Sequence, residues 1–227
     1  MNIPLSSRLL TCCSFVRPGD RVADIGCDHG YLGIYLLKNH IASEIIAADI
    51  NEGPLQSAVL NCQRYGAAEK IRFFLSDGAR NIPRDFDVMI CAGMGADTIV
   101  SILSAAPWLK SASYRLILQC QSKTPMLRQF LSENGWSINA ERLVRDGRFL
   151  YTVMDVHFAS GTPLSPAGWH FPYVLLDNPQ AEVSEYLGRV IGKLSLATAH
   201  QDNPQLSEIL HSLKTDPMLK EVLYDNR

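Results

Sequence analysis

The stretch Arg21-Val22-Ala23-Asp24-Ile25-Gly26-Cys27-Asp28-His29-Gly30-Tyr31-Leu32-Gly33 decides the fold of this 227-residue chain. Its first part is a short apolar run that includes the acid Asp24 and is typical of a buried strand. Gly26 and Gly30 follow, and a helical pattern then covers residues 31–37. Glycines at such a turn let the backbone approach a ligand closely, and the next helix directs its N-terminal amides at that ligand. The stretch therefore predicts a strand–turn–helix unit with a ligand site at the turn.

A second strand pattern, residues 43–50, contains another acid, Asp49, which lies 23 residues after Gly26. An acid at this offset accepts hydrogen bonds from both ribose hydroxyls of a nucleoside cofactor. The two features together predict that the chain binds an adenosine-containing molecule. The alternative is an ordinary strand-to-helix turn that binds nothing, and Asp49 makes that alternative the weaker one.

The glycine spacing separates the candidate cofactors. Dinucleotide-binding turns have the pattern G-x-G-x-x-G, in which a pyrophosphate lies at the helix N-terminus. Here the turn reads Gly26-Cys27-Asp28-His29-Gly30, and the Asp28 carboxylate would repel a pyrophosphate. Asp28 and Asp24 together suit a ligand that carries an ammonium group. We therefore expect S-adenosylmethionine rather than NAD.

Composition disfavours several protein classes. No apolar run approaches the roughly 18–20 residues of a membrane span, and residues 1–17 have the pattern of an amphipathic helix rather than a signal peptide. We expect a cytoplasmic protein without membrane contact. The 6 cysteines form no C-x-x-C pair and the 6 histidines are scattered, so we expect buried reduced thiols and no metal site.

Strand and helix patterns alternate along most of the chain. After the first two strands they cover, in order, residues 53–65 (helix), 70–75 (strand), 87–91 (strand), 97–103 (helix), 114–121 (strand) and 125–133 (helix). Such alternation predicts an α/β fold, with a Rossmann-like parallel sheet and helices on both faces.

Two β-rich runs, residues 136–144 and 149–158, break this alternation. The Asp146-Gly147 dipeptide between them is a strong signal for a β-hairpin. A sheet that ends in a hairpin is the layout of class I methyltransferases that use S-adenosylmethionine, whereas NAD-binding domains usually end in another parallel strand. The order of elements thus agrees with the cofactor expected from the turn.

The composition of the sequence and its pattern of predicted elements change near Ser160. A linker-like region rich in proline and glycine comes first. Asn178-Pro179 and Asn203-Pro204 then each place a capping asparagine before a proline at the first helical position, which predicts two amphipathic helices. We predict a catalytic domain over residues 1–159 and a helical, coiled-coil-like hairpin over residues 160–227. The pattern alone leaves open whether this tail is a structural cap or binds substrate.

With these segments identified, the chain resembles the bacterial TrmK-like tRNA (adenine-N1)-methyltransferases, which modify adenine 22 of tRNA. The resemblance covers nearly the whole chain. Its specific parts are the Asp28-His29 pair and the run Ala92-Gly93-Met94-Gly95. The other matching segments are residues 23–32, 48–54, 76–78 and 141–148.

The resemblance implies a role for each matching position. Gly26 and Asp28 would line the methionine end of S-adenosylmethionine, and Asp49 would hold its ribose. Asp77, with the backbone near Gly78, would read the adenine amino group of the cofactor, and residues 92–94 would form a wall between cofactor and target base. The predicted cofactor-binding set is Asp24, Gly26, Asp28, Gly30, Asp49, Ile50, Asp77, Gly78, Ala92, Gly93 and Met94.

The predicted catalytic residues are Asp28, His29 and Tyr31. Adenine N1 carries a free lone pair at neutral pH, so methyl transfer needs positioning and charge stabilisation rather than a strong base. N1 lies on the pairing edge, so a target inside a stem would have to leave its stack. Structural roles are equally open for two of these residues: His29 as a helix-start residue bonded to the backbone, and Tyr31 as a packing residue.

Charge argues against a strongly basic RNA-binding surface. The net charge is −2; the first 159 residues carry 16 basic and 15 acidic side chains, and the remainder carry 5 and 8. Phosphate contacts would need local patches. The candidates, each of which is also open to being an ordinary surface charge, are Lys123, Arg128, Arg142, Arg145 and Arg148.

Two positions depart from the TrmK-like pattern, and two other functions stay open. Ala96 stands where a further glycine is common, and we expect it to narrow the pocket for the target base. Cys120 stands near a position often held by proline. The alternative functions are methylation of another substrate and non-catalytic binding of RNA or S-adenosylmethionine. The sequence does not decide between a monomer and a dimer.

Overall fold

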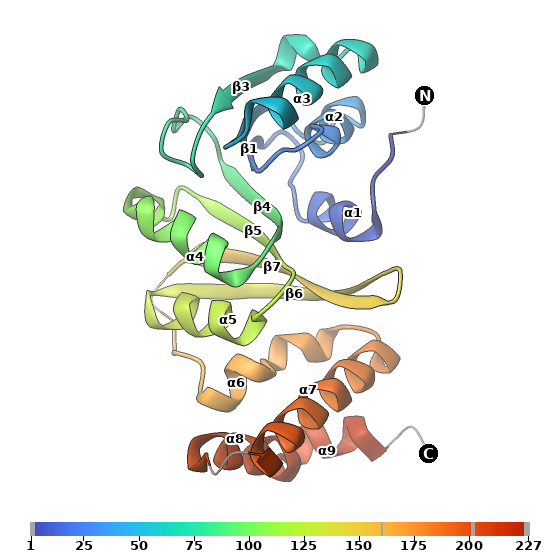
Figure 1. Cartoon of the computed structure of the whole chain (residues 1–227), viewed down its shortest axis with the longest axis vertical. Helices are drawn as coiled ribbons and strands as arrows, with labels where there is room; N and C mark the ends of the chain where they lie inside the picture. Colours follow the sequence, from blue (N-terminus) through green and yellow to red (C-terminus); the bar gives the residue numbers. More distant parts are fainter. Residues whose placement is uncertain (1–2, 160, 201–202, 225–227) are drawn as a thin grey trace.

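The structure is a computed structural model that describes residues 3–159, 161–200 and 203–224. Its centre is a seven-stranded sheet with the order β3-β2-β1-β4-β5-β7-β6 (Figure 1). The first five strands along the chain run parallel, and β7 pairs antiparallel with both β5 and β6. The strands are β1 (Arg21–Ile25), β2 (Glu44–Asp49), β3 (Ile71–Leu75), β4 (Val88–Met94), β5 (Arg115–Cys120), β6 (Trp136–Asp146) and β7 (Phe149–Phe158).

Helices cover both faces of this sheet. Successive residues of β1 point to opposite faces: Val22 packs among residues of α1, α2 and α3, whereas Ala23 packs among residues of α4 and α5. This arrangement confirms the predicted α/β, Rossmann-like fold. The helices are α1 (Ser7–Ser14), α2 (Tyr31–Lys38), α3 (Glu52–Tyr65), α4 (Ala96–Ala105), α5 (Thr124–Glu133), α6 (Pro166–His170), α7 (Gln180–His200), α8 (Pro204–Thr215) and α9 (Pro217–Tyr224). Short 3₁₀ turns occupy Ala68–Lys70, Pro107–Leu109 and Tyr173–Asp177.

The hairpin formed by β6 and β7 closes the sheet, as the Asp-Gly signal predicts. Asp146 pairs with Phe149, so Gly147 and Arg148 alone form the turn. Gly147 has a φ of +59°, in the left-handed region that glycine enters without steric cost. The hairpin projects beyond the sheet in Figure 1.

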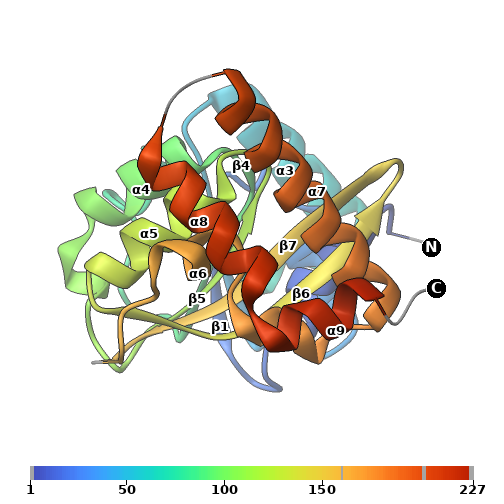
Figure 2. The same cartoon turned by 90° about the horizontal axis from the view of Figure 1, so that it is seen from below.

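The C-terminal helices form a third apolar cluster beside β6. Leu187 of α7 and Leu213 of α8 are buried there together with Leu143 of β6. Figure 2 shows α7, α8 and α9 in front of the β6 side of the sheet. The predicted boundary residue Ser160 lies outside the described residues, and the division into two domains stays a prediction.

The tail contains more helices than the two that the sequence predicts. Asp216 separates α8 from α9, and its carboxylate accepts hydrogen bonds from the amides of Met218 and Leu219. The proline-rich region expected to be a linker contains the short helix α6, capped by the hydroxyl of Ser165 at 3.1 Å from the amide of Gly168. Local capping has therefore divided the second predicted helix at Asp216 and created a short helix in the segment expected to be a linker.

Asn203 caps α8 as predicted, with its side-chain oxygen 3.1 Å from the amide of Leu206. The corresponding expectation for Asn178 is wrong. Its side-chain oxygen accepts a hydrogen bond from the amide of Leu143 at 2.7 Å, and its amide nitrogen donates to the carbonyl of Glu141 at 2.8 Å. Asn178 thus binds the start of the tail to β6 instead of capping α7.

Arg128 also joins the tail to the sheet, and its predicted contact with RNA phosphate is wrong. The side chain is fully buried, and its guanidinium forms a two-point ion pair with Glu141, with N–O distances of 2.7 and 3.2 Å. It also donates to the Tyr186 hydroxyl at 3.0 Å and to the carbonyls of residues 169 and 170. A guanidinium removed from water and fully paired has no donor left for a phosphate.

No helix in the described part of the chain combines the length and apolar character that crossing a membrane requires.

Candidate cofactor and substrate site

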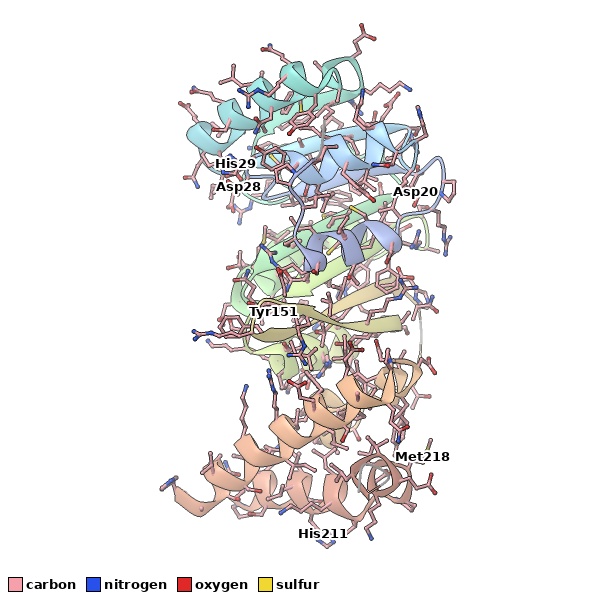
Figure 3. All side chains as sticks on the ribbon, turned by 90° about the vertical axis from the view of Figure 1, so that its right-hand side faces the viewer. Asp20, Asp28, His29, Tyr151, His211 and Met218 are labelled. Carbon is pink, nitrogen blue, oxygen red and sulfur yellow. The ribbon has the colours of Figure 1, made fainter. Side chains whose placement is uncertain are left out.

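A cavity of about 380 Å³ opens beyond the carboxyl ends of β1, β2 and β4. Ligands of open α/β sheets bind at this position. Figure 3 shows Asp28 and His29 at this edge of the sheet and Asp20 at the opposite edge. The cavity brings together these predicted residues: Asp24, Gly26, Asp28, His29, Tyr31, Asp49, Ala92, Gly93 and Met94.

The turn after β1 takes its shape from glycine and from β2. The amides of Gly26 and Cys27 both donate to the carbonyl of Ala48, at 2.8 and 3.0 Å, which holds the turn against β2. Gly26 has a φ of +72°, and a Cβ there would lie 2.4 Å from Cε of Met94. Glycine adopts this φ without strain, whereas any other residue would be strained and would also have to displace the end of the Met94 side chain.

Gly30 packs against α3, and its predicted role in cofactor binding stays a prediction. Its φ is +71°, and a Cβ at this position would lie 3.0 Å from Cβ of Ala58 on α3. Gly30 does not line the cavity. It allows α2 and α3 to pack closely, so the turn keeps its place between them.

Asp24 is the buried acid of the site. Its side chain is 4% exposed, and no described residue donates a hydrogen bond to it. Burial, and then the negative charges of Asp49 and Asp28, raise the pKa of Asp24 from 3.8 to about 7. A carboxyl that faces a cavity without a donor or a cation is a natural partner for a cationic ligand.

Asp49 is held in one orientation by the backbone. One carboxylate oxygen accepts a hydrogen bond from the amide of Asp28 at 3.2 Å, and the other accepts one from the amide of Asn51 at 3.0 Å. Each oxygen retains a further lone pair that a ligand hydroxyl can use. Asp49 is therefore oriented before any ligand binds.

The predicted catalytic residues lie at the mouth of the cavity. The Asp28 and His29 side chains are 68% and 53% exposed, and Nε2 of His29 is 3.6 Å from Oδ1 of Asp28. The His29 ring is also 5.9 Å from that of Tyr31, which packs edge-on against Tyr65 of α3. The side chain of His29 thus contacts Asp28 and Tyr31. The backbone carbonyl of His29 accepts a hydrogen bond from the side-chain amide of Asn61.

Residues 92–94 form one wall of the cavity through an irregularity in β4. The register between β4 and β5 shifts between Ala92 and Met94, and Gly93 has a φ of +78°. The amide of Gly93 donates to the side-chain oxygen of Gln119 at 2.9 Å, and Gln119 is fully buried on β5. This bulge turns the backbone of the wall toward the cavity.

Sequence reasoning missed Arg8, which reaches the cavity from α1. Its Nη1 donates to the same oxygen of Gln119 at 3.0 Å, and its Nε lies 3.4 Å from the carboxylate of Asp146 on the hairpin. A Cβ on Gly93 would lie 3.1 Å from Nη1 of Arg8. The available signal was Gln119, a polar residue inside the apolar strand pattern of residues 114–121.

Three other predicted cofactor residues lie outside the cavity lining. Ile50 is 61% exposed, and Asp77 is exposed and lies 3.5 Å from Nε of Arg80. A Cβ on Gly78 would lie 2.8 Å from Ile102, so this glycine permits close packing against α4. The amide of Ser76 donates to the carbonyl of Asp49 at 2.9 Å, which keeps this loop beside the site. The adenine-binding roles of Ile50, Asp77 and Gly78 remain predictions.

The two departures from the TrmK-like pattern do not line the cavity. Ala96 is fully buried in the cluster between the sheet and α4, and its effect on the base pocket stays a prediction. Cys120 is also buried, and its thiol donates to the carbonyl of Ser122. Both residues act on packing behind the wall.

The remaining candidate phosphate contacts mostly have partners. Lys123 pairs with Asp97 at 2.8 Å, and Arg145 pairs with Glu185 of the tail. Arg142 donates to the Ser14 hydroxyl at 2.7 Å and lies over the ring of Phe15. Arg148 instead stacks on an aromatic ring of the hairpin, as described below.

Comparisons with known proteins agree with this geometry. Residues 5–154 match the family described as methyltransferase domain. The tRNA (adenine(22)-N(1))-methyltransferase of Bacillus subtilis is 33% identical over 153 residues, which cover 67% of this chain and 64% of that protein. The matching segment thus spans less than two thirds of this relative.

Solved structures match over nearly the whole length. Sp1610 of Streptococcus pneumoniae, a candidate tRNA (m1A22) methyltransferase, is 31% identical with a TM-score of 0.79, over 97% of this chain and 100% of that one. The structure of Sp1610 in complex with S-adenosyl-L-methionine has a TM-score of 0.78 and 29% identity, over 96% and 98% of the two chains.

Proposed function

The chain belongs to the methyltransferase-domain family, and from that premise we propose that it transfers a methyl group from S-adenosylmethionine to N1 of an adenine in tRNA. The predicted resemblance to the TrmK-like proteins is confirmed by the 31% identity to the candidate tRNA (m1A22) methyltransferase Sp1610 over all of that chain. Those relatives point to adenine 22 as the target.

One observation carries the proposal: Asp24 is a buried carboxyl that faces the cavity without a partner among the described residues. Asp28 and Asp49 add negative charge around it, and the only basic residues of the lining are Arg8 and His29. S-adenosylmethionine carries both an ammonium and a sulfonium. A cation of this kind would relieve the repulsion among the three acids.

The residues of the cavity fit the cofactor. Asp24 and Asp28 would hold its ammonium group, and the two oriented oxygens of Asp49 would accept hydrogen bonds from its ribose hydroxyls. Gly26 lets the turn approach the Met94 side chain closely, and both residues line the cavity. When bound, S-adenosylmethionine supplies an electrophilic methyl group on a positively charged sulfur.

The chain's own contribution to catalysis is position and charge. The wall of residues 92–94 would hold the target base in line with the methyl group and exclude water. Asp28, exposed at the mouth, would stabilise the positive charge that develops on the methylated base. His29, within ion-pair distance of Asp28, would take the N6 proton that leaves, and Tyr31 would offer a ring on which the base stacks.

The substrate and the organisation of the chain follow from this proposal. The target adenine would leave its stack to reach the cavity mouth. Residues 1–159 would form the catalytic domain, and residues 160–227 would form a helical appendage held by Arg128 and Asn178. A tRNA substrate would place the protein in the cytoplasm.

The test is methylation of unmodified tRNA transcripts, with nucleosides analysed by mass spectrometry. Transcripts with adenine at position 22 should gain N1-methyladenosine, and matched transcripts with guanine there should not. The Asp49→Ala variant should lose the product, whereas Asp97→Ala, which removes a surface acid paired with Lys123, should keep it. Cofactor binding without methylation of any tRNA would contradict the proposal and favour another substrate or a non-catalytic binder.

A further inference from the structure

The tip of the β6–β7 hairpin extends past the edge of the sheet at which the cavity opens. Cys120, the last residue of β5, pairs with Thr152 of β7, so residues 149–151 lie beyond the end of β5. Figure 3 shows Tyr151 on the same side of the molecule as Asp28 and His29. The hairpin tip is therefore a neighbour of the cavity mouth, not of the opposite edge.

The register of the hairpin decides which side chains face the cavity. Phe149 pairs with Asp146 and Tyr151 pairs with Val144, so both aromatic residues share a face with Asp146. The Asp146 carboxylate contacts Arg8, and Arg8 lines the cavity. The aromatic face of the hairpin is thus continuous with the rim of the site.

Two aromatic rings and one guanidinium form the surface of this tip. The Phe149 side chain is 48% exposed, and its ring lies 5.9 Å from that of Tyr151. The Arg148 guanidinium lies 4.9 Å from the Phe149 ring, and no acid of the described residues pairs with it. The neighbouring charges are already neutralised, because Arg145 pairs with Glu185 and Asp146 with Arg8.

We propose that Arg148, Phe149 and Tyr151 bind the nucleotides that flank the target adenine in tRNA. This inference rests on the proposed function. A base exposed when the target leaves its stack would stack on the Phe149–Tyr151 face, and Arg148 would contact the adjoining phosphate. The exposed Phe149 ring, the half-buried Tyr151 ring and a guanidinium without an acid partner are elements with which proteins hold unpaired RNA.

The position of this surface favours RNA over a protein partner. An unpaired guanidinium complements a phosphate, and the other hairpin arginines and Lys123 already have partners. The surface also adjoins the cavity at which the target base would react. A chain with a net charge of −2 needs such local contacts to hold an anionic substrate.

The experiment measures tRNA binding by fluorescence anisotropy in the full-length protein. Phe149→Ala should raise the Kd for tRNA about tenfold, a loss of about 1.4 kcal/mol, because it removes a ring on which a base stacks. Phe149→Tyr, which keeps a ring, should bind like the wild type. Arg148→Ala should weaken binding and reduce the slope of log Kd against log salt by about 1.

A matched control removes a similar group elsewhere. Arg84 stacks 4.7 Å from the Trp108 ring, and it lies before β4, at the opposite edge of the sheet from the cavity. Arg84→Ala should leave tRNA binding unchanged. Unaltered affinity for S-adenosylmethionine and an unaltered melting temperature would show that the hairpin variants keep their fold.

Binding and turnover separate this inference from the proposed function. If Phe149→Ala and Arg148→Ala both bind tRNA like the wild type, the hairpin proposal is wrong even if the enzyme methylates tRNA. If the wild type binds tRNA through these residues but transfers no methyl group, the proposed reaction is wrong and the hairpin surface stands. A wild type that binds no tRNA would overturn both. Should Phe149→Ala fold poorly, Arg148→Ala still decides the question.

Discussion

Two regions of this molecule bury ionisable groups, and they do so in opposite ways. Under the tail, Arg128 is fully buried but paired with Glu141 and bonded to Tyr186 and two carbonyls. At the carboxyl ends of the strands, Asp24 is nearly as buried, but no described residue donates to it. In the first region the buried charge has its partners within the chain, whereas in the second the buried carboxyl has none among the described residues.

This difference separates structure from function. Burying an unpaired charge is costly, so a fold keeps one where a ligand or a shifted pKa compensates it. The paired Arg128 network therefore indicates a joint between the catalytic sheet and the tail. The acids around Asp24 indicate a site for a cation. Five predictions test this contrast, beginning with the largest expected effect.

Breaking the complete network should destabilise the protein without affecting the ligand site. Arg128→Met leaves Glu141 buried without its cation, so we expect the free energy of unfolding to fall by about 3–5 kcal/mol. For a chain of this size the melting temperature should fall by about 6–20 °C. Urea and thermal unfolding would measure both quantities.

The double variant Arg128→Met/Glu141→Leu is the control, because it removes both charges and should recover most of the lost stability. Affinity for S-adenosylmethionine should stay near that of the wild type in the folded protein. A stability equal to the wild type for Arg128→Met alone would show that the network is not the joint.

Substituting Asp49 should have the opposite effect to substituting Arg128, because it should weaken cofactor binding. Asp49→Ala deletes the two charge-assisted hydrogen bonds that we propose to the ribose, each worth about 1.5–3 kcal/mol, so the Kd for S-adenosylmethionine should rise at least about 100-fold. Isothermal titration calorimetry would measure the change. Asp97→Ala should bind like the wild type. Wild-type affinity in Asp49→Ala would remove this residue from the cofactor site.

The raised pKa of Asp24 makes a pH-dependent prediction. A cationic ligand binds the ionised carboxylate better, so affinity should increase as pH rises toward about 7 and level off above it. Below that value the Kd should change by up to about tenfold per pH unit. Asp24→Asn should bind weakly at every pH and lose this dependence. A flat profile in the wild type would contradict the assignment.

The same group affects stability with a defined sign. The folded chain holds a proton on Asp24 up to about pH 7, whereas the unfolded chain releases it near 3.8. The protonated Asp24 carboxyl therefore contributes to the free energy of unfolding. That contribution is fully present below the unfolded pKa of 3.8 and is lost as pH rises through the folded pKa of about 7. Without ligand, Asp24→Asn should therefore be more stable than the wild type at pH 8 and similar to it near pH 4, as melting curves would show.

The smallest effect is expected at Ala96, which lies behind the wall and outside the cavity. Ala96→Gly restores the common residue and should change kcat/KM less than about twofold. A glycine in the first turn of α4 should cost less than about 1 kcal/mol of stability. An increase in kcat/KM of several-fold would instead support the hypothesis that Ala96 narrows the base pocket.

Much of the site could be predicted because its residues follow the ends of neighbouring strands. Asp28, Asp49 and Gly93 each follow or end a strand pattern, and parallel strands place their carboxyl ends at one edge. Their convergence therefore required only the order of elements. Ile50 and Asp77 satisfy the same rule but lie outside the cavity lining, because the rule locates an edge and not the direction of a side chain.

Arg128 and Arg8 have roles that the sequence pattern could not predict. Both are single arginines on amphipathic helices, and nothing local distinguishes them. Arg128 donates a hydrogen bond to Tyr186, which lies 58 positions away in the sequence. Arg8 donates one to Gln119, at a separation of 111 positions. One became a buried joint and the other part of the cavity wall, because distant segments pack differently around each.

The amino-acid sequence by itself determined the alternation of strands and helices, the glycine turn and the acids that follow the strands. These features depend on contacts between residues a few positions apart, which a linear pattern records. Only the tertiary structure decided which charges are paired and which face the cavity. Pairing depends on what packs against a side chain after folding, and that neighbour can come from anywhere in the chain.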